Sequence, residues 1–117
     1  MIRLLFVVLT MMMVAGCSSK SEKEFIYPPR LSPGDTIALV APSRSISIER
    51  IDSAQAGLEA RGYKVIRHPN IAAEYKGYLN APDEEKARLL MEAFMDPEID
   101  AIFPVTGGYS AGRMIRF

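Results

Sequence analysis

A short run of apolar residues, Thr36 to Pro42, constrains the fold more than any other feature of the sequence. The run reads TIALVAP and does not alternate between polar and apolar residues. A strand with one face in water alternates in this way, whereas a strand covered on both faces is apolar throughout. We therefore expect a sheet in which this strand is buried between two layers.

Helical and strand-like segments alternate after this run. In chain order they are a helix over 48–61 that ends before Gly62, a strand over 63–68, a helix over 82–96 and a strand over 100–105. With right-handed crossovers, the order β-α-β-α-β predicts an α/β fold, a parallel sheet with helices on both faces. In the second helix, the expected buried stripe consists of Ala87, Leu90, Met91 and Phe94.

The chain begins with the pattern of a secretory signal, MIRLLFVVLTMMMVAGC. One basic residue, Arg3, precedes an apolar run that is shorter than the ~20 residues needed to span a bilayer. The pair Ala15-Gly16 directly before Cys17 is similar to the bacterial lipobox, in which the cysteine is lipidated after cleavage. An ordinary secretory peptide with a cysteine at the cut is the alternative.

Cys17 is the only cysteine, so lipidation would remove a thiol that has no disulfide partner within the chain. We expect a signal peptide over 1–16, a membrane tether over 17–30 and one domain over 31–117. The predicted location is the bacterial cell envelope, with the protein anchored by lipid. Ser18, rather than aspartate, after the cysteine favours the outer membrane.

The charge pattern argues against nucleic acid as a partner. The chain holds 14 basic and 14 acidic residues, and removing 1–16 takes away Arg3 and leaves a net charge of −1. Basic patches typical of nucleic-acid binding are not evident. One histidine, one cysteine and scattered acids do not make a zinc site. We expect no metal and no cofactor.

The segment TGGYSAGR, residues 106–113, follows the third predicted strand and is the candidate site. Gly107 and Gly108 permit a tight turn and leave backbone amides free to hold a developing oxyanion. Ser110 is the candidate catalytic nucleophile, because Gly108-Tyr-Ser-Ala-Gly112 fits the G-x-S-x-G pattern between a strand and a helix. The N-cap of the following helix is an equal alternative for Ser110.

A serine nucleophile needs a base, and the only histidine is His68, at the end of the second predicted strand. If the first strand lies between the other two, His68 and Ser110 are two strand spacings apart, ~10 Å. A hydrogen bond cannot cover that distance. We therefore expect His68 to be a loop histidine rather than the catalytic base.

Two blocks of sequence carry a family resemblance. LSPGDTIALVAPS and GYLNAPDEEKARLLMEAFMDPEIDAIFPVTGGYSAGR resemble the N-terminal part of LD-carboxypeptidases, the muramoyltetrapeptide carboxypeptidases, a family that includes microcin-immunity peptidases. The resemblance covers Leu31 to Phe117 and implies a flavodoxin-like N-terminal domain. It also implies a serine peptidase that removes the C-terminal D-alanine from peptidoglycan tetrapeptides, and it suggests a homodimer.

In this family the nucleophilic serine lies in the corner after the third strand, and its glutamate and histidine partners come from a separate C-terminal domain. Because the sequence ends before such a domain, we expect a truncated N-terminal fragment that is inactive alone. Tyr78, in GYL, is expected either to line the cleft or to serve as a packed tyrosine.

The corner departs from the family pattern, which commonly reads GGYGS followed by a variable residue and arginine. When the pattern is aligned on Gly107, the position that usually holds serine in the family corresponds to Ala111 here. Ser110 corresponds to the preceding position, which usually holds glycine or asparagine. Either Ser110 acts from one position earlier or the nucleophile is absent. The second case predicts a non-catalytic lipoprotein that binds peptidoglycan peptides, and an unfolded gene fragment is a third alternative.

Overall fold

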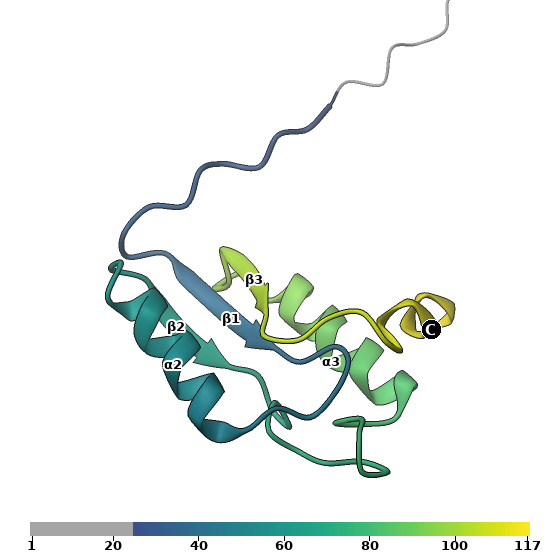
Figure 1. Cartoon of the computed structure of the whole chain (residues 1–117). Helices are drawn as coiled ribbons and strands as arrows, with labels where there is room; N and C mark the ends of the chain where they lie inside the picture. The colour runs from purple at the N-terminus through teal and green to yellow at the C-terminus, as the bar shows by residue number, and fades with distance from the viewer. Residues whose placement is uncertain (1–24) are drawn as a thin grey trace, which may run out of the picture.

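The computed structural model describes residues 25–117, so the predicted signal peptide and Cys17 lie outside the described residues. Its elements are β1 (Thr36–Val40), α2 (Ile48–Glu59), β2 (Lys64–Arg67), α3 (Asp83–Met95), β3 (Ala101–Pro104) and the 3₁₀ helix η1 (Ala111–Arg116). The three strands are parallel and lie in the order β2-β1-β3 (Figure 1). Each strand and α-helix falls within its predicted range, and the predicted α/β fold is confirmed.

The segment before β1 contains no helix or strand from residue 25 onward, and its residues are exposed up to the turn that opens the domain (Figure 1). Residues 25–30 of this segment fall in the predicted tether, and the rest fall in the predicted domain. Among residues 25–117, no helix has the length and apolar character needed to cross a membrane.

The core forms on both sides of β1, because successive side chains of a strand point to opposite faces. On one side, Leu39 packs with Ile51 of α2 and with Ile71. On the other side, Ala38 and Val40 pack with Ala93 of α3. The two helices therefore cover opposite faces of the sheet, as the continuous apolar run of β1 predicts.

The buried stripe of α3 agrees with the prediction at Ala87, which is buried, and at Leu90, which packs against the core, but not at the other two positions. Met91 is 55% exposed and Phe94 is 66% exposed, whereas the buried residues of the helix are Lys86, Ala87, Leu89 and Ala93. The buried face is therefore turned away from Met91 and Phe94 and toward Lys86 and Leu89, which the prediction did not include.

We predict that replacing Ile51 by alanine destabilises the domain by about 2–5 kcal/mol, because a fully buried side chain is removed and a cavity is left. Ile48→Ala is the matched control: it makes the same change in the first turn of α2, where the side chain is 47% exposed. Its expected cost is within about 0.5 kcal/mol. Urea unfolding measures both, and equal losses would contradict this packing.

Candidate functional site

The candidate corner lies at the carboxyl edge of the sheet, directly after β3. Open α/β sheets bind ligands at this edge. The backbone turns sharply here, since Gly108 has φ 95° and Ser110 has φ 69°. Ser110 then directly precedes η1.

The backbone of the corner keeps hydrogen-bond donors available. Within residues 25–117, the N–H groups of Gly107, Gly108, Tyr109 and Ser110 donate no hydrogen bond to another backbone group. Both glycines are exposed. Exposed amides without a backbone partner are what an oxyanion requires, and the role of Gly107 and Gly108 in holding one stays a prediction.

The hydroxyl of Ser110 contacts the protein interior. Ser110 is buried, and its Oγ accepts a hydrogen bond from Lys86 Nζ at 2.6 Å. Ser110 occupies the N-cap position of η1 but makes no side-chain cap hydrogen bond. Neither of the two roles predicted for Ser110 describes this contact, in which a buried ammonium holds the hydroxyl.

Lys86 belongs to a polar network that joins α3 to η1. Its Nζ lies 3.0 Å from Asp83 Oδ1 and its side chain is 1% exposed. Arg113 of η1 binds the same carboxylate, with Nε 2.8 Å from Asp83 Oδ2. The hydrogen bond from Lys86, with that from Arg113 and the two positive charges, lowers the pKa of the Asp83 carboxyl against the opposing effect of burial.

The loop after β1 holds the corner from the other side. Ser43 is fully buried and its hydroxyl donates to the backbone carbonyl of Tyr109. Thr106 Oγ1 donates to the carbonyl of Arg44 at 3.3 Å. The conformation of the corner therefore depends on both β1 and α3.

An open groove runs beside the corner, and aromatic rings form part of its wall. The rings of Tyr78 and Tyr109 meet edge to face, with centroids 5.8 Å apart and planes at 75°. The Arg113 guanidinium lies 5.9 Å from the Tyr109 ring centroid. The remaining lining residues are Tyr75, Lys76, Leu79, Pro82 and Asp83. Tyr78 thus both lines a groove and packs against a second tyrosine, which combines the two roles expected for it.

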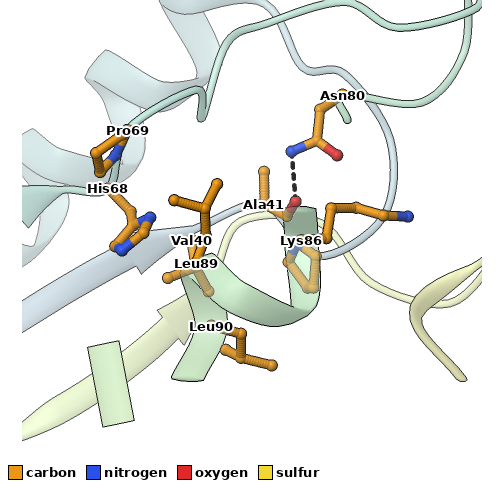
Figure 2. A pocket seen from close by; sticks show the side chains of 9 residues that line it. Val40, Ala41, His68, Pro69, Asn80, Lys86, Leu89 and Leu90 are labelled. Atoms are coloured by element: carbon orange, nitrogen blue, oxygen red, sulfur yellow. Dashed lines mark hydrogen bonds between the residues drawn. The ribbon is translucent and has the colours of Figure 1, made fainter. Parts of the chain in front are cut away.

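His68 does not line this groove. It lines a separate small cavity, together with Val40, Asn80 and Lys86 (Figure 2). The Lys86 side chain points away from the His68 ring. β1 lies between β2, which His68 follows, and β3, which leads to the corner, so the strand order assumed for the predicted separation of His68 from Ser110 is confirmed. Asn80 Nδ2 donates to the Ala41 carbonyl at 2.6 Å, whereas its buried Oδ1 has no partner among the described residues.

Sequence reasoning missed the residues that support the corner: Ser43, Asp83, Lys86 and Arg113. One signal for this network was present in the sequence. Asp83 and Lys86 are three residues apart in a predicted helix, the spacing at which opposite charges meet. Ser43 carried no such signal, because the carbonyl it binds lies 66 residues away in the chain.

This geometry defines a class of protein: a parallel α/β domain with a glycine-rich corner at the carboxyl edge of its sheet. The sequence model of the LD-carboxypeptidase N-terminal domain matches residues 37–117. The chain belongs to the LD-carboxypeptidase family.

Curated relatives agree with this assignment. The chain is 36% identical over 97 residues to a Streptomyces coelicolor protein that is named as a carboxypeptidase, covering 79% of this chain and 30% of the relative. It is 32% identical over 81 residues to the murein tetrapeptide carboxypeptidase of Pseudomonas aeruginosa, covering 68% of this chain and 25% of the relative. The chain spans 25% to 33% of the length of the curated relatives that it matches.

Solved structures share the fold. An MccF-like protein from Bacillus anthracis superposes with a TM-score of 0.71 at 28% identity, over 80% of this chain and 29% of that one. The muramoyltetrapeptide carboxypeptidase from Oxalobacter formigenes gives a TM-score of 0.59 at 30% identity, over 69% and 26% of the two chains. The sheet and helices described above are therefore the N-terminal portion of this family's fold.

We predict a pH-dependent role for Asp83 in stability. Its folded-state pKa lies below the ordinary value of 3.8, so the ionised carboxylate stabilises the fold above that pH. This stabilisation is lost as the pH falls through the lowered pKa. Asp83→Asn should therefore be less stable than the wild type near neutral pH, and the gap should close in strong acid.

Urea unfolding across the acidic range measures this gap. Glu84→Gln is the control, since Glu84 is exposed in the same turn and makes no ion pair within residues 25–117. A gap between wild type and Asp83→Asn that is independent of pH would show that the charge of Asp83 is not what stabilises the fold.

Proposed function

We propose that this protein takes part in a serine-type LD-carboxypeptidase reaction that removes the C-terminal D-alanine from peptidoglycan tetrapeptides, and that residues 1–117 by themselves do not catalyse it. The observation that carries the proposal is the family match over residues 37–117, which includes the whole of the corner. The name of the Pseudomonas aeruginosa relative specifies murein tetrapeptide as its substrate. The proposal transfers that substrate class to this protein.

In the proposed reaction, the serine hydroxyl attacks the carbonyl carbon of the bond that precedes D-alanine. The carbonyl oxygen becomes an oxyanion, and the backbone N–H groups near Gly107 and Gly108 are the proposed donors to it. The hydroxyl proton passes to the histidine that the family resemblance implies, and then to the leaving amine. Water completes the cycle by hydrolysing the acyl-enzyme.

Ser110 is the proposed nucleophile within these residues. Its environment also supports a second candidate function, a non-catalytic lipoprotein that binds peptidoglycan peptides. Ser110 is left-handed at φ 69°, a conformation that glycine and asparagine tolerate better than other residues. The resemblance implies glycine or asparagine at this position, and both residues suit this backbone conformation. The usual serine column falls on Ala111, the first residue of η1.

We predict that the protein isolated from its source cells releases D-alanine from murein tetrapeptide. Ser110→Ala should lower that release at least about a thousandfold, because loss of a nucleophile removes the covalent step. Mass spectrometry of the tripeptide product measures the rate. Ser53→Ala, an exposed serine on α2, is the matched control and should leave the rate unchanged.

Two results would count against Ser110 as the nucleophile. Undiminished release by Ser110→Ala would show that another group attacks. Tetrapeptide binding without any release by the wild type would favour the binding function, and restoring release with Ala111→Ser would then place the lost hydroxyl in the family's usual column.

We further propose that Cys17 is lipidated and anchors the protein in the bacterial envelope, at the outer membrane. The support is the apolar run followed by the pair Ala15-Gly16 directly before Cys17. Cells grown with radiolabelled palmitate should yield labelled protein in the membrane fraction. Cys17→Ser should remove the label, and an equally labelled Cys17→Ser protein would rule out this attachment site.

A further inference from the structure

Lys86 is a charged side chain at a place where the rest of the helix face is apolar. It is 1% exposed, while Ala87, Leu89 and Ala93 of α3 are buried around the same face. Removing an ammonium from water is costly unless charge and hydrogen-bond partners compensate it. Its partners here are the Asp83 carboxylate and the Ser110 hydroxyl.

These contacts form a chain of four side chains that begins and ends beside the corner. Ser110 contacts Lys86, Lys86 contacts Asp83, and Asp83 contacts Arg113. Ser110 and Arg113 lie at the start of η1, whereas Asp83 and Lys86 lie in the opening turns of α3. The corner is thus attached to α3 at two points that are three residues apart.

One of the two contacts with α3 is made by Ser110, whose backbone conformation is unfavourable. A serine with φ 69° costs roughly 1–2 kcal/mol relative to the right-handed conformation. Such a residue persists only where its surroundings enforce it. The contact that holds its side chain within the described residues is the hydrogen bond from Lys86.

We propose that Lys86 is a positioning residue of the candidate site. Through its hydrogen bond to Ser110 Oγ, it keeps Ser110 in the left-handed conformation and so sets the direction of the backbone N–H groups from residue 107 to residue 111. The effect on catalysis rests on the proposed function, but the effect on backbone geometry does not.

The test is a comparison of Lys86→Met with Arg88→Met in the isotopically labelled full chain. Both variants remove one positive charge from α3, but Arg88 is exposed and pairs with Glu85 and Glu92 on the surface. Lys86→Met should shift the amide resonances of residues 107–111 and move the φ-dependent coupling constant of Ser110 away from its left-handed value. Arg88→Met should leave both in place.

Repeating the Lys86→Met substitution in a Ser110→Gly protein distinguishes a positioning effect on Ser110 from a general loss of stability. Glycine adopts positive φ without help, so in Ser110→Gly the Lys86→Met change should no longer move the resonances of residues 107–109. The two substitutions should also be coupled by about tenfold in the equilibrium constant for unfolding, as expected for a hydrogen bond to a charged group.

Three outcomes would overturn the proposal: wild-type resonances in Lys86→Met, equal shifts in Arg88→Met, or equal shifts in the Ser110→Gly background. If Lys86→Met fails to fold, Ser110→Ala removes the same hydrogen bond from the other partner. The outcomes are read as for Lys86→Met: shifted resonances support the proposal, and unshifted resonances contradict it. Because these signals do not depend on D-alanine release, failure of the proposed function leaves this test unaffected.

Discussion

The burial of β1 on both faces is the constraint on which the rest of the structure depends. Leu39 faces α2 while Ala38 and Val40 face α3, so one strand of five residues holds both layers together. Because β1 is the central strand, its carboxyl end lies in the middle of the carboxyl edge of the sheet. The loop that leaves it there carries Ser43, whose hydroxyl holds the backbone of Tyr109 in the corner.

The candidate site therefore rests on two kinds of interaction. Apolar burial places β3 beside β1, and this brings the corner to the edge where ligands bind in such folds. Polar contacts from Ser43 and Lys86 then determine how the backbone turns within the corner. Burial is nondirectional, whereas hydrogen bonds and ion pairs require particular geometry. The fine geometry of the site follows from the second kind.

The departure of the corner from the family pattern has a physical meaning in this structure. Ser110 occupies a left-handed position, and its hydroxyl is held by a buried ammonium. Lys86 Nζ donates to the Ser110 oxygen in this arrangement, which ties the hydroxyl to α3. Ala111 leaves the next position without a hydroxyl.

Sequence alone determined the element order and the parallel sheet, since these follow from local periodicity and the handedness of crossovers. It also located the corner, whereas the position of β1 between β2 and β3 was only an assumption until the structure showed it. The tertiary structure decided which face of α3 is buried, and with it the contact between Lys86 and Ser110 across 24 residues. More than one face of α3 around Ala87 and Leu90 is compatible with the spacing of its apolar side chains. Only packing against the sheet selects one of them, because the partner of a buried charge lies on another segment of the chain.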